Sequence, residues 1–169
     1  MTRVLVTGMS GVGKSTVIAA LGERGHRAVD TDSATWSRWE RLPDGSPDWV
    51  WREDAIALLL AEDDPRPLFL AGCKSNQGRF YPQLTAVVLL TAPLETLLDR
   101  IAHRDTYPYG KSDEERALVV RHVATVEPLL RRTATHVIDA TAPVPTIVEQ
   151  LEAIAATSGS RRRRITRGS

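Results

Sequence analysis

The sequence has 169 residues, of which 25% are charged, and a formal net charge of +1, so it fits one domain with a sizeable core and has no basic excess for binding nucleic acid through its body. The single cysteine, Cys73, excludes an internal disulfide framework and favours a reducing compartment, which we expect to be the cytoplasm. No apolar run approaches the ~18 residues of a membrane-spanning helix, so no membrane partner is expected.

Strands and helices alternate along the first half of the chain. Residues 3–7 are a short run of mainly branched apolar residues, which is typical of a buried strand, and residues 14–24 are good helix formers that end before Gly25. Residues 26–30 predict a second strand, and residues 36–49 predict mostly loop with a possible helical turn. Helical spacing resumes over residues 50–63, and two prolines end it before a third strand at 67–72.

The same alternation continues to the end of the chain. Residues 85–91 predict a fourth strand, and a helix with apolar residues at i, i+3, i+4 and i+7 follows Pro93. Ser112 and Glu115 have the spacing of a capping box, which predicts a helix from there to about Arg132. Residues 136–140 predict a fifth strand and residues 145–157 a last helix. This order predicts a parallel sheet of five strands with helices on both faces.

The chain ends in a basic segment. Residues 158–169, SGSRRRRITRGS, combine small residues with five arginines and have no apolar face. We therefore expect one domain over residues 1–157 and a disordered tail over 158–169, which would be the only part able to contact nucleic acid. A plain solvated tail is the other interpretation.

A phosphate-binding loop follows the first predicted strand. Residues 8–15, GMSGVGKS, fit the pattern G-x-x-x-x-G-K-[ST] and open the first predicted helix, where backbone N–H groups and the helix dipole favour a polyphosphate. Lys14 would neutralise the β and γ phosphates, and Ser15 would supply a hydroxyl to Mg²⁺. The predicted nucleotide-binding residues of the loop are Gly8, Gly11, Val12, Gly13, Lys14, Ser15 and Thr16.

Two carboxylates, Asp30 and Asp32, end the second predicted strand. The third and fourth predicted strands end without an acid, and the carboxyl ends of adjacent parallel strands share one crevice. Asp30 and Asp32 are therefore the nearest candidates to lie beside a bound Mg²⁺ and the reacting groups. They can also be interpreted as turn formers at a strand end.

The chain resembles a known group of enzymes in four places: the loop GMSGVGKS, the segment VDTDS at 29–33, the arginines Arg100 and Arg104, and VIDATAPV at 137–144. Together these resemble the nucleoside-monophosphate-kinase-like group of small phosphate-loop kinases, which includes shikimate, gluconate and dephospho-coenzyme A kinases. The resemblance spans roughly residues 3–155. It implies a three-layer α/β P-loop NTPase fold, with ATP and Mg²⁺ as cofactors. It also implies a segment that covers the acceptor, at about 33–64, and a short lid at about 104–113 that includes Pro108.

The resemblance also implies roles for individual residues. Asp30 would help Ser15 to hold Mg²⁺, and Asp32 would contact the acceptor hydroxyl and draw off its proton. Arg100 would stack on the adenine, and Arg104 would close on the phosphates, so that Lys14, Asp32, Arg100 and Arg104 form the predicted catalytic set. Two solvated arginines at a helix end are the alternative interpretation.

The acceptor side of the site is less specific. All four tryptophans, Trp36, Trp39, Trp49 and Trp51, fall within sixteen residues, and they either line an acceptor pocket or form a local core under a long loop. Donors suited to an acceptor follow the third predicted strand at Lys74, Asn76, Gln77 and Arg79. The predicted acceptor-binding residues are Asp32, Trp36, Arg52, Gly72 and Lys74.

These features favour an ATP-dependent kinase that transfers the γ-phosphate to a hydroxyl or phosphate of a small acceptor such as a nucleoside, a nucleotide or a sugar acid. The alternative is an ATP-binding regulatory or nucleic-acid-associated protein that docks through the basic tail, including a polynucleotide 5′-kinase. The sequence does not predict an oligomeric state.

Overall fold

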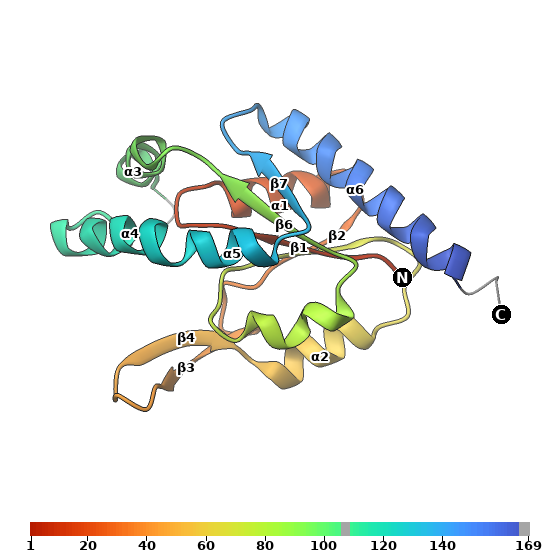
Figure 1. Ribbon diagram of the computed structural model, residues 1–169, viewed down its shortest axis with the longest axis horizontal. Coiled ribbons are helices and arrows are strands. Elements are labelled where there is room, and N and C mark those ends of the chain that lie inside the picture. The colour runs from red at the N-terminus through yellow and green to blue at the C-terminus, as the bar shows by residue number, and fades with distance from the viewer. Residues whose placement is uncertain (106–108, 166–169) are drawn as a thin grey trace.

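The computed structural model describes residues 1–105 and 109–165, with the backbone alone from residue 160 on (Figure 1). Pro108 of the predicted lid and residues 166–169 of the predicted tail therefore lie outside the described residues. The helices and strands follow in chain order: β1 (Arg3–Thr7), α1 (Lys14–Glu23), β2 (Arg27–Asp30), β3 (Ser37–Arg41), β4 (Pro47–Trp51), α2 (Glu53–Ala61), β5 (Leu68–Ala71), the 3₁₀ helix η1 (Gln77–Gln83), β6 (Ala86–Thr91), α3 (Leu94–His103), α4 (Asp113–Thr125), α5 (Glu127–Thr133), β7 (His136–Asp139) and α6 (Val144–Ile165).

The predicted parallel sheet of five strands is confirmed. Its strands lie in the order β2-β5-β1-β6-β7, and every neighbouring pair is parallel. Figure 1 shows α1 and α6 together on one side of this sheet and α2 on the other. The protein therefore has the three-layer α/β architecture that the alternation of strands and helices predicted.

Alternate residues of the central strands supply two separate cores. Val4 and Val6 of β1 pack in the cluster that includes α1 and α6, whereas Leu5 packs with Trp51, α2 and η1. Successive side chains of a strand point to opposite faces, so a strand covered on both sides is apolar throughout. This double burial holds the sheet rigid and fixes the carboxyl ends of β1, β2 and β5, where the polar residues of interest lie.

The segment expected to be mostly loop, residues 36–49, instead contributes an antiparallel hairpin formed by β3 and β4. The turn between the strands depends on Asp44 and Gly45. Gly45 has a φ of 85° and its N–H donates to the carbonyl of Leu42 at 2.8 Å, while the Asp44 carboxylate accepts from the N–H of Ser46 at 2.9 Å. A left-handed glycine after an aspartate is what such a tight turn needs.

The helix expected from residue 112 to about Arg132 is divided in two. α4 ends at Thr125 and α5 begins at Glu127, with Pro128 in its first turn. Proline cannot donate a backbone hydrogen bond to the preceding turn, so it starts a new helix here. The capping box itself is confirmed, because the Ser112 hydroxyl accepts from the N–H of Glu115 at 3.2 Å and the Glu115 carboxylate accepts from the N–H of Ser112 at 3.4 Å.

The last helix is longer than expected. α6 runs from Val144 to Ile165, so the backbone of residues 158–165 is helical where disorder was predicted. A helix already nucleated and packed over its first turns can extend through arginines, which are good helix formers. Across the described parts of the chain, none of the helices offers a stretch both long and apolar enough to span a bilayer.

Candidate functional site

The phosphate loop connects β1 to α1 and is shaped by its glycines. Gly13 has a φ of 98° at the start of α1, and no atom lies within 4 Å of where a β-carbon would stand. Gly11 is needed for a different reason: a β-carbon there would lie 2.7 Å from the carbonyl oxygen of Leu97 on α3. Among the described residues, no side chain caps the N-terminus of α1 and no acid lies in its first turn. The loop thus presents an uncapped helix end to an anion.

Lys14 lies across this loop. Its Nζ donates to the carbonyl oxygens of Gly8 at 2.6 Å and Met9 at 3.1 Å. Burial lowers the pKa of Lys14 below its ordinary 10.5, although nearby groups, including two carboxylates, act in the opposite direction. Phosphate oxygens that took the place of the two carbonyls would relieve this cost, because they bring negative charge to a poorly solvated ammonium.

The two residues predicted to hold Mg²⁺ are in direct contact. The Ser15 hydroxyl donates to Oδ2 of Asp30 at 2.5 Å, and Oδ1 of Asp30 accepts from the N–H of Asp32 at 3.0 Å. Within residues 1–105 and 109–165 there is no group of three or more His, Cys, Asp or Glu side chains that could hold a metal ion. Mg²⁺ in nucleotide sites uses few protein oxygens together with phosphate and water, so a hydroxyl and a carboxylate at this position fit it.

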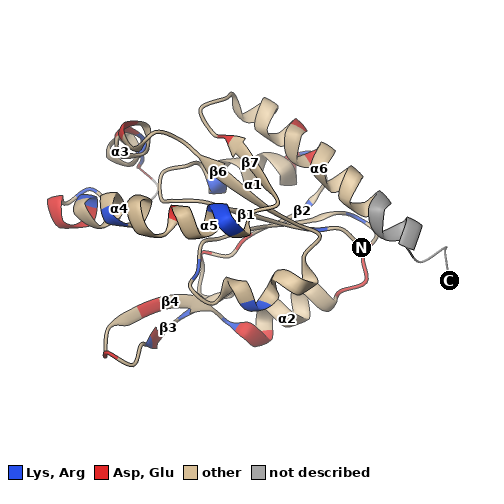
Figure 2. Ribbon diagram, in the orientation of Figure 1, with Lys and Arg blue, Asp and Glu red and all other residues tan. Residues whose placement is uncertain are grey.

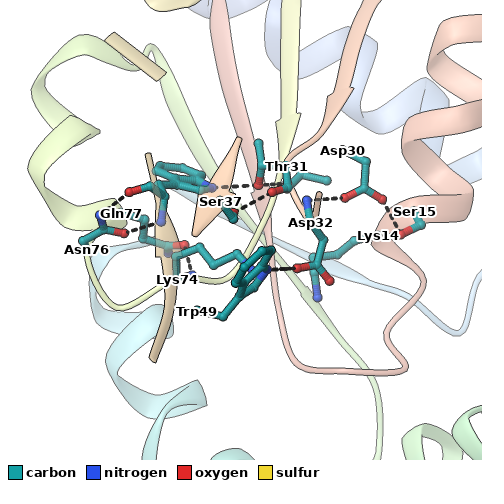
Figure 3. A network of polar contacts seen from close by, with 12 residues as sticks. Lys14, Ser15, Asp30, Thr31, Asp32, Ser37, Trp49, Lys74, Asn76 and Gln77 are labelled. Atoms are coloured by element: carbon teal, nitrogen blue, oxygen red, sulfur yellow. Dashed lines mark hydrogen bonds and ion pairs between the residues drawn. The ribbon is translucent and has the colours of Figure 1, made fainter. Parts of the chain in front are cut away.

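Asp32 is the meeting point of three chain segments (Figure 3). Its Oδ1 accepts from Nζ of Lys74, in the loop after β5, at 2.7 Å, and from Nε1 of Trp49, on β4, at 2.8 Å. Partial burial favours the protonated acid, but the hydrogen bond and charge of Lys74, helped by Trp49, hold the pKa of Asp32 below its ordinary 3.8. Asp32 is therefore a carboxylate at neutral pH and a weak base.

The backbone around Asp32 is fixed by its buried neighbour Thr31. The Thr31 hydroxyl donates to the carbonyl of Ala71 at 2.6 Å and accepts from Nε1 of Trp51 at 2.7 Å, and the Ser37 hydroxyl donates to the carbonyl of Thr31 at 2.7 Å. These bonds tie the end of β2 to β5 and to both strands of the hairpin. Gly72 completes this packing, because a β-carbon there would lie 2.5 Å from the Thr31 hydroxyl oxygen.

Two amides that the sequence suggested as acceptor-binding donors hold the site together instead. Gln77 is buried, and its side-chain oxygen accepts from the N–H of Lys74 at 3.0 Å. Asn76 bonds both the N–H and the carbonyl of Trp51 at 3.0 Å. The sequence does not reveal these roles, because each amide contacts a partner whose position depends on the folded loop. Arg79 forms an ion pair with Glu53 at 2.8 Å.

The four tryptophans do not form a single cluster. Trp51 is 0% exposed and belongs to the core, and Trp36 is half-buried against the same core. Trp49 contacts Asp32, whereas Trp39 is 67% exposed with its ring centroid 5.1 Å from that of Trp49. The core interpretation therefore holds for Trp51 and Trp36, and the interpretation as an acceptor pocket stays a prediction for Trp39 and Trp49. Arg52 lies at the hairpin base, with its side chain 3.8 Å from the Asp54 carboxylate.

Arg100, in α3, and Arg104, directly after this helix, both contact the phosphate loop. Arg100 donates to the carbonyl of Val12 at 3.2 Å and to that of Ala140, after β7, at 2.8 Å. Arg104 donates to the Ser10 hydroxyl at 3.4 Å and to the carbonyl of Tyr109 at 2.6 Å. These contacts place both guanidinium groups beside the loop, so they are not simply solvated charges at a helix end.

Comparisons with known proteins agree with this geometry. A family model described as AAA domain matches residues 4–121. A gluconokinase from Sinorhizobium meliloti 1021 is similar in structure with a TM-score of 0.55 and 19% identity, covering 99% of this chain and 97% of that one.

Two shikimate kinases are also similar in structure. The enzyme from Acinetobacter baumannii, solved in complex with shikimate, has a TM-score of 0.64 and 19% identity over 93% of this chain and 94% of that one. The enzyme from Bacteroides thetaiotaomicron has a TM-score of 0.66 and 17% identity over 90% of this chain and 97% of that one. No curated protein matches the sequence. The chain thus belongs to the AAA domain family of phosphate-loop proteins and has the fold of the small-molecule P-loop kinases.

Proposed function

We propose that this protein is an ATP-dependent kinase that uses Mg²⁺ and transfers the γ-phosphate to a hydroxyl or phosphate of a small acceptor, such as a nucleoside, a nucleotide or a sugar acid. The observation that carries the proposal is the position of Asp32. It joins the phosphate-loop side, through Asp30 and Ser15, to the hairpin and to Lys74. A cytoplasmic location, supported by the single cysteine, is part of the proposal.

The residues of the phosphate loop would supply positive charge and orientation. Lys14 and the N–H groups at the start of α1 would bind the phosphates, while Arg100 and Arg104 would hold the nucleotide from the side of α3. Mg²⁺, held by Ser15 and Asp30, would offset the charge of the phosphate oxygens when bound. Phosphoryl transfer depends mainly on such positioning and neutralisation, because its transition state is loose.

Asp32 would orient the acceptor. Its pKa is held low, so it would accept a hydrogen bond from the acceptor hydroxyl and take the proton late in the transfer. Lys74 and Trp49 would keep the carboxylate in place, since both donate to the same oxygen. The role is orientation first and proton transfer second.

The proposal is tested by incubating the purified full chain with ATP, Mg²⁺ and candidate acceptors, and by measuring ADP release and the phosphorylated product by mass spectrometry. We expect Asp32→Ala to lower kcat by about 100-fold or more while the affinity for an ATP analogue changes less than about threefold. Asp64→Ala is the control, because Asp64 pairs with Arg66 before β5, at the amino end of that strand. Unchanged product formation by Asp32→Ala would refute the assignment of Asp32.

A further inference from the structure

The hairpin has an aromatic face that lies next to Asp32. Trp39 of β3 and Trp49 of β4 are directly opposite each other, so their side chains lie on the same face of the hairpin. Their ring centroids are 5.1 Å apart, and the indole N–H of Trp49 donates to Asp32 at 2.8 Å. Two adjoining indoles therefore extend from the carboxylate towards solvent.

Trp39 does not fill the core. It is 67% exposed, whereas Trp51 on the same hairpin is 0% exposed and fills the core. An indole left mostly in water offers an apolar ring surface that a second flat group can cover. Trp49 is held by its bond to Asp32 and by Nζ of Lys74, which lies 5.6 Å from its ring centroid. Trp39 thus rests on a fixed neighbour.

Most of the cations on and beside the hairpin already pair with carboxylates, whereas Arg41, next to the turn, donates to the carbonyl of Gly45 at 3.3 Å. Figure 2 shows charges of both signs along the hairpin and at the start of α2. The pairs are Lys74 with Asp32 at 2.7 Å, Arg38 with Glu40 at 2.6 Å, Arg52 with Asp54 at 3.8 Å and Arg79 with Glu53 at 2.8 Å. An acceptor that held a carboxylate or a phosphate next to Asp32 would have to break the pair of Asp32 with Lys74 to gain a cation there, so the charge balance at Asp32 favours a neutral acceptor.

We propose that the acceptor is a neutral hydroxyl compound with a planar ring, which stacks on Trp39 and Trp49 while its hydroxyl meets Asp32. This inference rests on the proposed function and narrows it. In the transfer, the acceptor oxygen forms a bond to the γ-phosphorus of ATP as the bond from that phosphorus to the bridging oxygen breaks. The hydroxyl proton passes to Asp32 and then to solvent, and ADP leaves. Nucleosides and aromatic alcohols share this chemistry.

Binding distinguishes the acceptor classes directly. The full chain is saturated with Mg²⁺ and a non-hydrolysable ATP analogue, so that nucleosides cannot occupy the nucleotide site, and is titrated by calorimetry with three sets of compounds. Neutral planar compounds are nucleosides and benzyl-type alcohols, neutral non-planar ones are inositol and glycerol, and anionic ones are gluconate, shikimate and nucleoside monophosphates. We expect a neutral planar compound to bind at least about tenfold more tightly than either other set.

Nucleosides and benzyl-type alcohols, the two kinds of neutral planar compound, are distinguished by which of them binds more tightly. Preferred binding of a non-planar or an anionic compound would overturn the inference, and so would a failure of every neutral planar compound to bind.

Variants of Trp39 test the stacking itself. Trp39→Leu should weaken binding of the planar compound, and raise its KM, by about tenfold with kcat within about twofold, because stacking positions the ring and leaves the reacting atoms unchanged. Trp39→Phe should retain affinity within about threefold. Leu58→Ala is the control, since Leu58 is an exposed apolar residue on α2, 72% exposed. An unchanged affinity in Trp39→Leu would overturn the inference.

The outcomes also separate this inference from the proposed function. A planar compound that binds through Trp39 but is never phosphorylated would leave the stacking surface established and refute the kinase proposal. Phosphorylation of an anionic acceptor alone would support the kinase proposal and refute the planar, neutral acceptor.

Discussion

The two halves of the candidate site are built in different ways. The half proposed to bind the phosphates, the nucleotide half, is one continuous stretch, residues 8–16, whose backbone is shaped by its own glycines. The half proposed to bind the acceptor, the acceptor half, is assembled from the end of β2, both strands of the hairpin and the loop after β5. It is held by bonds between residues up to 42 positions apart. The nucleotide half, as a local motif, can keep its chemistry in proteins that differ elsewhere. The acceptor half depends on several segments, so a substitution in any one of them can change which ligand it binds.

The largest effect is expected at Lys14. Lys14→Ala should reduce transfer by about 1,000-fold, because the phosphates lose the cation that spans the loop, while circular dichroism shows an unchanged fold. The loss should appear with every acceptor, as expected of the shared nucleotide half. Arg66→Ala, which removes an exposed cation away from the loop, serves as the control and should keep wild-type rates. A loss of activity with only one acceptor would contradict the assignment of Lys14 to a nucleotide half that serves every acceptor.

Gly72 tests the packing of the acceptor half. In Gly72→Ala the new methyl group would stand 2.5 Å from the Thr31 hydroxyl and 3.2 Å from Nε1 of Trp51, which should cost about 1–3 kcal/mol of unfolding free energy and raise the acceptor KM. Affinity for an ATP analogue should stay within about twofold. Gly78→Ala is the matched control, because no atom lies within 4 Å of its added β-carbon. Equal melting temperatures for the two variants would contradict the packing role of Gly72.

Trp49 tests the support of Asp32. Trp49→Phe keeps a ring against Trp39 but removes the N–H that donates to the carboxylate at 2.8 Å. A hydrogen bond to a charged group is worth about 1.5 kcal/mol, so kcat should fall by about tenfold with ATP affinity unchanged. Steady-state kinetics at saturating ATP measure this. A kcat equal to that of the wild type would show that Lys74 alone holds Asp32.

The smallest effect concerns the start of α4, next to the segment predicted as a lid. Backbone hydrogen bonds, from Gly110 at 2.9 Å and from Ser112, hold the pKa of Glu115 below its ordinary 4.5. A depressed pKa in the folded state contributes stability that is present above the unfolded pKa and is lost as the pH falls through the folded one. Glu115→Gln should therefore lower the melting temperature slightly at pH 7 and by less at pH 3, with Glu114→Gln unchanged at both.

The sequence was sufficient for the sheet and for the phosphate loop, since both depend on short local patterns. It predicted the five parallel strands from apolar runs such as residues 85–91, and it made Asp30 a candidate near the loop because the carboxyl ends of parallel strands share one crevice. Asp30 does contact Ser15, although β5 lies between β1 and β2. These features need no knowledge of distant partners, because a strand buried on both faces is apolar along its length.

The hairpin was missed because Trp39 is the only apolar residue of β3, which leaves that strand without an apolar pattern, and because the base of the hairpin packs on Thr31 through Trp51. Pro43, Asp44 and Gly45 carried a local turn signal that could have indicated it. The partnership of Lys74 with Asp32 depends on the folded loop, which no spacing in the sequence reveals. Pro128 likewise was a visible signal for the break between α4 and α5.

The way in which the hairpin is attached has an evolutionary consequence. Its base is anchored by Trp51 and by the bond from the N–H of Arg52 to the carbonyl of Trp36 at 2.8 Å, whereas the turn at residues 42–46 touches little else. Mutations in the outer part of the hairpin can therefore accumulate without unfolding the sheet or disturbing the phosphate loop. Related chains could therefore change their acceptor by changing the hairpin alone, while the phosphate loop stays the same.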